Sequence, residues 1–280
     1  MVAPTVGGTD TPVLEARDVV KEYVGGDGAR LRVLDGVSLA VARGEMVAIV
    51  GESGAGKSTL LHVLGALDRP GGGEVRLAGE SLAGRSETAL AALRNEFVGF
   101  VFQFHHLLRE FTALENVMMP LQIAGLGPRA ARERAGALLE RVGLAARMQH
   151  RPAALSGGEQ QRAAVARALA VGPAVLLADE PSGNLDQANA ERLHELFAGL
   201  ARDQRLGLVV VTHNPALAGR AQRVLRLDGG KLVDAAGTLD RRASGRDLTS
   251  GGRGHLEAPA AVLGRSERGA PDNGREEGQR

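Results

Sequence analysis

The residues best suited to chemistry lie in one glycine-rich segment between two apolar runs, residues 46–50 and 60–64. The segment consists of Gly51, Glu52, Ser53, Gly54, Ala55, Gly56, Lys57, Ser58 and Thr59. It follows the pattern G-x-x-x-x-G-K-[ST], in which backbone N–H groups surround an oxyanion and a helix N-terminus adds its positive end. In such a loop Lys57 reaches the β- and γ-phosphates and Ser58 ligates Mg²⁺. Because Lys57 is one of only three lysines in the chain, a nucleotide site is favoured over a purely structural turn.

Two acidic residues, Asp179 and Glu180, directly follow a third apolar run at residues 174–178. A carboxylate at the end of a buried strand beside a phosphate loop can hold Mg²⁺, which pairs Asp179 with Ser58. Glu180 has a different geometry and can orient and deprotonate an attacking water. The alternative is a surface acidic pair, which the phosphate loop upstream disfavours.

A further segment begins a predicted helix with two glycines. It consists of Leu155, Ser156, Gly157, Gly158, Glu159 and Gln160, followed by Gln161 and Arg162. Ser156 and Glu159 have the spacing of a capping box. A capping box does not require two glycines in the first turn, where they expose backbone N–H groups. We therefore expect a second anion site at this helix N-terminus.

The elements that must position these residues predict an α/β protein. Alternating runs at residues 13–24 and 31–41 predict an antiparallel sheet beside the nucleotide core, and residues 74–79 predict a further alternating strand. Residues 174–178 and 208–211 are fully apolar and predict buried parallel strands, separated by an amphipathic helix at 187–201.

The region between these strands, residues 87–170, is predicted to be mostly helical, with an amphipathic helix at 130–144 that ends near Gly143. Residues 1–12 are rich in Gly, Thr and Pro and predict a flexible leader. Residues 241–280 lack periodicity and predict a disordered tail.

The composition of the chain excludes several classes of function. Its 280 residues carry a formal net charge of +1, so nucleic acid is not expected as a partner. The absence of cysteine excludes disulfides and thiol chemistry. No apolar run approaches the ~20 residues that cross a bilayer, so any membrane connection is expected to come through a partner.

Taken in order, the phosphate loop, Gln103, the 155–162 segment, Asp179–Asp186 and His213 resemble the nucleotide-binding subunits of ATP-binding-cassette (ABC) transporters. The resemblance implies a phosphate-loop NTPase fold over residues 13–240, with a parallel-sheet core, an antiparallel β subdomain and a helical subdomain. It also implies ATP and Mg²⁺ as cofactors. In that family two subunits dimerise head to tail, and each ATP lies between one subunit's phosphate loop and the other's signature segment, here residues 155–160.

The resemblance assigns roles to residues outside these motifs. Tyr23, the only tyrosine, matches the aromatic residue that stacks on adenine. Gln103 matches the glutamine that touches the metal shell and reports to the transmembrane partner, and His213 matches the switch histidine that contacts the γ-phosphate. The segment across the dimer interface, called the D-loop, is matched by Ser182, Gly183, Asn184, Leu185 and Asp186.

Five of the six phenylalanines lie close together: Phe97, Phe100, Phe102, Phe104 and Phe111. The stretch from 100 to 121 is similar to ATPases that release lipoproteins from the bacterial inner membrane. This similarity implies two LolC/LolE-like transmembrane subunits and a position on the cytoplasmic face of that membrane. The rings either pack a helical-subdomain core or line an apolar groove that receives a helix of the membrane subunit. At Phe104 the groove is favoured.

Two other functions remain open at this point. One is an ATP-gated signalling module like FtsE, which moves a membrane partner without transporting anything. The other is an efflux ATPase like MacB, whose fused form is disfavoured by the lack of a membrane-spanning run.

Overall fold

Short apolar runs form the central sheet of the computed structural model, which describes residues 11–26, 28–204 and 206–235. Its strands are β3 (Met46–Val50), β6 (Val98–Val101), β7 (Val175–Asp179), β8 (Gly207–Val211), β9 (Arg223–Asp228) and β10 (Lys231–Asp234). They follow the order β10-β9-β3-β8-β7-β6, and every neighbouring pair is parallel except β10 with β9. Every residue of β8 is buried, as expected for a parallel strand covered on both faces.

The second sheet is antiparallel, in the order β2-β1-β4-β5. Its strands are β1 (Leu14–Val24), β2 (Arg30–Val41), β4 (Gly72–Leu77) and β5 (Glu80–Ser81). This confirms the antiparallel sheet predicted from the alternating runs.

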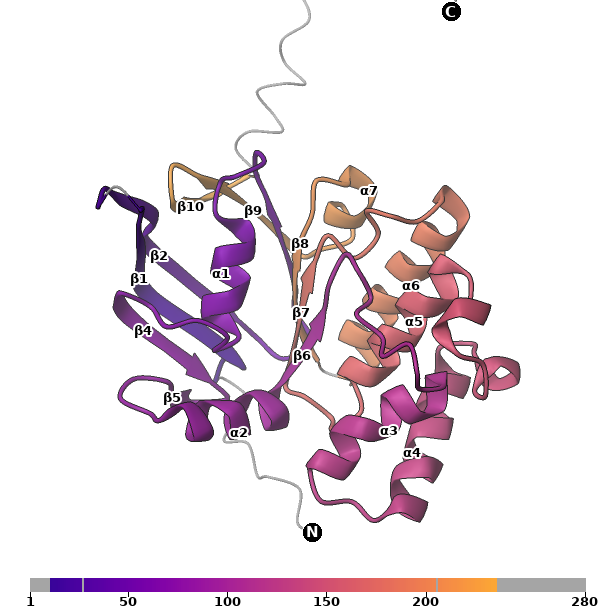
Figure 1. Ribbon diagram of the computed structural model, residues 1–280. Coiled ribbons are helices and arrows are strands. Elements are labelled where there is room, and N and C mark those ends of the chain that lie inside the picture. Colours follow the sequence, from indigo (N-terminus) through magenta and orange to yellow (C-terminus); the bar gives the residue numbers. More distant parts are fainter. Residues whose placement is uncertain (1–10, 27, 205, 236–280) are drawn as a thin grey trace, which may run out of the picture. The chain divides into compact units, whose positions relative to one another are not determined.

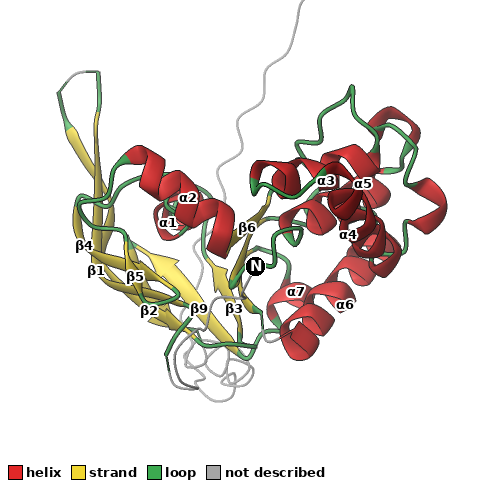
Figure 2. Ribbon diagram, turned by 90° about the horizontal axis from the view of Figure 1, so that it is seen from below, coloured by secondary structure: helices red, strands yellow, loops and turns green. Residues whose placement is uncertain are grey.

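Helices cover both faces of the central sheet. They are α1 (Lys57–Leu64), α2 (Glu87–Phe97), α3 (Ala113–Ile123), α4 (Pro128–Arg141), α5 (Gly157–Ala168), α6 (Gln187–Gln204) and α7 (Pro215–Ala218), with 3-10 turns at Ala145–Arg147 and Pro152–Ala154. Helix α1 lies between the two sheets (Figure 1), whereas α3 to α6 gather on the other side of the central sheet (Figure 2).

The alternation of side chains along each central strand divides the core into layers. In β7, Val175 and Leu177 face the cluster shared with α1 and the antiparallel sheet. Leu176 and Ala178 face the cluster shared with α5 and α6. A third cluster joins α3, α4 and α5, so α5 links the central sheet to the neighbouring helices.

The helical span contains one strand that the sequence did not predict. Residues 98–101 form β6, the edge strand beside β7. This strand begins directly after α2 with no turn residue between them, so the sequence did not distinguish it from the helix. The predicted end of α4 is confirmed: Gly143 has φ 75°, and the Leu144 N–H donates to Leu139 O at 2.7 Å.

Both ends of the chain lie largely outside the residues that the structure describes. Of the predicted leader, only residues 11 and 12 are described, and the predicted tail at 241–280 lies wholly outside the described residues. Among the helices that are described, none combines the length and the apolar character needed to cross a bilayer.

Candidate functional site

The carboxyl ends of four parallel strands meet at one edge of the central sheet. Val211 of β8 is in register with both Ile49 of β3 and Asp179 of β7, and Ala178 is in register with Val101 of β6. The residues that follow these strands are therefore neighbours although they are far apart in sequence. Ligands of open α/β sheets bind at this edge.

A cleft of about 560 Å³ lies at that edge. It is lined by Val33, Gly51, Ser53, Gly54, Gly56, Lys57, Ser58, Thr59, Gln103, Asp179, Glu180 and His213. The structure thus brings most of the phosphate loop together with the predicted metal ligands and the residues proposed for catalysis.

The phosphate loop requires glycine where its backbone is left-handed or closely approached. Gly56 precedes α1 with φ 96°, and a Cβ there would lie 2.7 Å from Val33 Cγ1. A Cβ on Gly51 would lie 2.6 Å from Leu227 O of β9. The Lys57 ammonium donates to the carbonyls of Gly51 (3.0 Å) and Glu52 (2.8 Å), so the cation lies over the loop.

Glu180 and His213 hold each other at the rim of the cleft. The His213 Nδ1 lies 2.8 Å from Glu180 Oε1, and the His213 backbone N–H donates to Glu180 Oε2 at 3.3 Å. The carboxylate is mostly buried and the imidazole is mostly exposed. Glu180 itself has φ 44°, a conformation that a non-glycine residue adopts only at a cost.

The donor set of Ser58, Asp179 and Gln103 fits a hard cation. A hydroxyl, a carboxylate and an amide oxygen are ligand types of Mg²⁺, which usually keeps several waters and substrate phosphates as its other ligands. The Gln103 amide nitrogen donates to Asn184 Oδ1 at 3.2 Å, so this contact uses the nitrogen rather than the oxygen. The described residues contain no cluster of three or more His, Cys, Asp or Glu that could hold a metal by itself.

The predicted D-loop lies beside the cleft rather than in its lining. Asn184 contacts Gln103, while Asp186 accepts hydrogen bonds from the backbone and side-chain nitrogens of Asn189 at 2.9 and 2.6 Å. These bonds lower the pKa of Asp186.

The predicted signature segment lies apart from the cleft of its own chain. Its capping box is confirmed: the Glu159 N–H donates to Ser156 Oγ at 3.3 Å, and the Ser156 N–H donates to Glu159 Oε2 at 2.8 Å. That backbone hydrogen bond lowers the pKa of Glu159. A Cβ on Gly158 would lie 2.4 Å from Asn189 Oδ1, so glycine permits the close approach of α5 and α6.

Tyr23 also lies outside the lining of the cleft. The residue is 41% exposed, its hydroxyl donates to Asp68 Oδ2 at 2.9 Å, and Lys21 Nζ lies 5.0 Å from the ring centroid. Its role in adenine stacking stays a prediction.

The phenylalanines divide between the two interpretations. Phe97 and Phe100 pack against the core, and Phe100 stacks on Phe102 with centroids 5.6 Å apart. Phe104 is 64% exposed and Phe111 is 40% exposed. Exposure removes the core interpretation for Phe104.

Sequence reasoning missed two residues that hold the loop between Gln103 and Phe111. Asn116 is buried in α3, accepts the Leu108 N–H at 2.8 Å and donates to the carbonyls of Leu108, Phe111 and Thr112. Arg167 of α5 donates to the carbonyls of His105 and His106 at 2.9 and 2.7 Å, and burial lowers its pKa. A polar residue inside an apolar helical stripe was the available signal for Asn116.

Fold and site together define a phosphate-loop nucleotide-binding domain. The sequence profile of the ABC transporter family matches residues 34–183, more than half of the chain. The chain therefore belongs to the ABC transporter family, as one of its ATP-hydrolysing subunits.

Several curated relatives carry the name lipoprotein-releasing system ATP-binding protein LolD. The protein from Geobacter metallireducens is 53% identical over 221 residues, covering 79% of this chain and 98% of that protein. The proteins from Xanthomonas euvesicatoria and Bordetella pertussis are each 54% identical, covering 81% and 79% of this chain and 92% and 95% of those proteins.

Solved structures agree with this assignment. A dimeric ATP-binding cassette in a post-hydrolysis state, bound to ADP and Pi, superposes with a TM-score of 0.73 at 36% identity, covering 78% of this chain and 96% of that chain. A dimeric bacterial ABC transporter cassette gives the same TM-score at 37% identity and the same coverage.

Proposed function

We propose that this chain is the ATP-hydrolysing subunit of a bacterial ABC complex that releases lipoproteins from the inner membrane. The observation that carries the proposal is the 53% identity to a lipoprotein-releasing ATPase over 98% of that protein. The FtsE-like and MacB-like alternatives are not favoured, because the relatives reported above share the lipoprotein-releasing name.

In the proposed reaction, the phosphate loop and the Lys57 ammonium hold the β- and γ-phosphates of ATP. Mg²⁺ held by Ser58, Asp179 and Gln103 would neutralise charge on these phosphates. Glu180 accepts the proton of the attacking water, and His213, hydrogen-bonded to it, contacts the γ-phosphate.

The position of the signature segment supports a head-to-tail dimer. Residues 155–160 do not line the cleft of their own chain, yet their helix N-terminus carries the features of an anion site. In the proposed dimer the signature segment of one subunit closes the cleft of the other over ATP, and the D-loop crosses the interface. The dimeric cassettes among the solved relatives support this arrangement.

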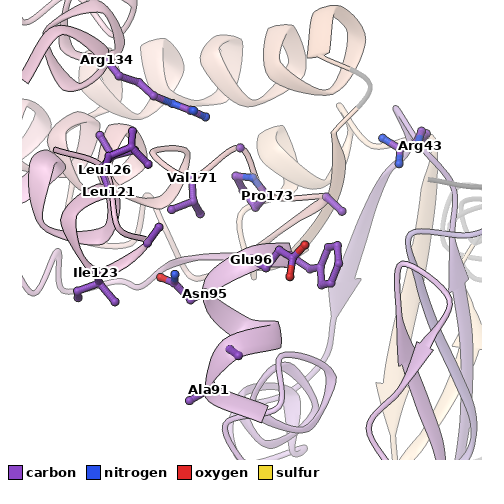
Figure 3. Close-up of a pocket in the computed structure, with 15 residues that line it drawn as sticks. Arg43, Ala91, Asn95, Glu96, Leu121, Ile123, Leu126, Arg134, Val171 and Pro173 are labelled. Carbon is purple, nitrogen blue, oxygen red and sulfur yellow. The ribbon is translucent and has the colours of Figure 1, made fainter. Parts of the chain in front are cut away.

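A groove between α2 and α3 is the proposed site for the membrane subunits. It has a volume of about 800 Å³, with Ala91 and Asn95 of α2 on one wall and Leu121 and Ile123 of α3 on the other (Figure 3). A smaller adjoining pocket shares Asn95 and Ile123 and reaches Phe102, just before the exposed Phe104. Apolar side chains line this groove together with Asn95, Glu96 and Arg134, a mixture suited to an amphipathic helix of a LolC/LolE-like subunit. Such subunits would hold the chain at the cytoplasmic face of the inner membrane.

Reconstitution tests the proposal. The chain is co-expressed with the LolC/LolE-like proteins of the same genome, the complex is placed in proteoliposomes with a fluorescent lipoprotein, and release is measured with and without ATP. We expect ATP-dependent release, which Glu180→Gln abolishes. Hydrolysis and stable assembly without any release would instead support the FtsE-like function.

A further inference from the structure

The cleft does not account for one buried polar residue, His194 of α6. It is 1% exposed and lies in the apolar stripe of this helix beside Leu193, one turn before Phe197. Burial of an imidazole is unfavourable unless its ring nitrogens find partners. One of them does, because His194 Nε2 lies 3.0 Å from the hydroxyl of Ser182, which is itself buried.

Ser182 lies in the turn that immediately follows Glu180. The Gly183 N–H donates to Glu180 O at 3.0 Å, and the Leu185 N–H donates to Ser182 O at 3.2 Å. Glu180 is held in a left-handed backbone conformation, which persists only where the surrounding structure enforces it. A bond that anchors Ser182 therefore also anchors the backbone of Glu180.

Burial, rather than the neighbouring charges, favours a neutral ring at His194. Its Nδ1 lies 3.8 Å from Glu191 Oε2, and Glu191 is paired with Arg220. Burial lowers the pKa of His194, and Arg220 acts in the same direction while Glu191 opposes it. The contact with Ser182 at neutral pH is thus a hydrogen bond between neutral groups.

Ser182 and His194 also line a second cleft, of about 510 Å³, which shares Glu180 and His213 with the nucleotide cleft.

We infer that His194 is a positioning residue for ATP hydrolysis: through Ser182 it holds the turn that keeps the Glu180 carboxylate against His213. His194 does not line the nucleotide cleft, and its hydrogen bond to Ser182 is the contact through which it acts on the turn. The inference rests on the proposed role of Glu180 as the acceptor of the water's proton.

A double-mutant cycle tests the inference in the full chain. His194→Leu, Ser182→Ala and the double variant are assayed for kcat, for binding of a fluorescent ATP analogue and for melting temperature. We expect each single variant to lower kcat about three- to tenfold, as expected for one neutral hydrogen bond, with ATP binding unchanged. The double variant should be no slower than the slower single variant, because both remove the same bond.

Two further variants separate positioning from packing. His194→Gln keeps a side-chain hydrogen-bonding group and should recover most of the rate lost in His194→Leu. The matched control Phe197→Leu, one turn away in the same stripe, should lower the melting temperature without a selective loss of kcat.

Single-variant effects that multiply in the double variant, or an unchanged kcat in His194→Leu, would overturn the inference. Hydrogen exchange at the Gly183 amide gives a readout independent of hydrolysis, and both single variants should accelerate it. If the wild type hydrolyses no ATP, the proposed function fails, while unaltered exchange at Gly183 would by itself overturn the role of His194.

Discussion

The nucleotide cleft and the loop between Gln103 and Phe111 both lie after the carboxyl ends of strands of the central sheet. They differ in which groups form hydrogen bonds within the chain. In the cleft, charged groups are engaged with neighbours inside the chain, as Lys57 is with the loop carbonyls and Glu180 is with His213. In the loop, Asn116 and Arg167 form hydrogen bonds with the backbone, while the apolar side chains of Phe104 and Phe111 remain exposed.

This difference indicates how each region meets its ligand. ATP must replace hydrogen bonds that the cleft already makes, so binding there involves an exchange of polar partners. The loop, next to the proposed α2–α3 groove, presents apolar side chains that are already exposed, so a partner helix would gain contacts there without first breaking any. Substitutions in one region should therefore leave the other nearly intact, and this separation can be tested.

The largest expected effect is on chemistry in the cleft. Glu180→Gln keeps the size of the side chain but cannot accept the proton of the attacking water, which typically costs ~10²–10⁴ in rate. We expect ATP to bind and the variant to accumulate as a dimer, measured by light scattering with ATP and Mg²⁺. Hydrolysis by Glu180→Gln at the wild-type rate would remove Glu180 from this role. As a control, the membrane subunits should pull down this variant as well as the wild type, because the loop is unchanged.

Lys57→Ala should fail one step earlier, at binding. It deletes the charge proposed to bind the β/γ-phosphates, and a hydrogen bond to a charged group contributes about 1.5–3 kcal/mol, or roughly 10- to 150-fold in affinity. Titration with a fluorescent ATP analogue measures the loss. Binding as tight as that of the wild type would contradict the phosphate-loop assignment.

Phe104→Ala tests the loop between Gln103 and Phe111. Because Phe104 is 64% exposed, removal of its ring should leave the melting temperature and basal hydrolysis nearly unchanged. Assembly with the membrane subunits should weaken by ~2 kcal/mol or more, about 30-fold, as expected for a buried aromatic anchor at an interface.

A matched control for this variant is Val233→Ala. Val233 is 41% exposed and belongs to β10, at the opposite edge of the six-stranded sheet from β6. Its substitution should not affect pull-down by the membrane subunits. Equal losses from both variants would show that general surface hydrophobicity, rather than the loop, drives assembly.

The smallest effect is expected from removing the residues after Asp240, which belong to neither region. This segment contains few apolar residues, and their burial cannot offset the entropy lost on ordering the chain, ~1–2 kcal/mol per residue for the backbone alone. Hydrolysis and melting temperature should stay almost unchanged. A decrease of more than a few degrees would indicate that these residues pack on the body.

The features that could be predicted from the sequence are those set by local rules. Local backbone conformation, within a few residues, determines the phosphate-loop glycines and Lys57, the Ser156–Glu159 capping box and the left-handed Gly143 just after α4. The apolar runs that became β7 and β8 were also predictable, because wholly apolar segments of that length are typical of buried parallel strands.

Only the tertiary structure determined which distant residues meet. The bond between Glu180 and His213 and the bond between Ser182 and His194 both depend on how strands and helices pack, which no spacing encodes. The phenylalanines show the same limit, since the segment from Phe100 to Phe111 is mostly loop and has no periodicity to distinguish buried rings from exposed ones. Periodicity reports burial only where a regular backbone repeats. In a loop, the environment of each ring depends on how the backbone is held, here by Asn116 of α3 and Arg167 of α5.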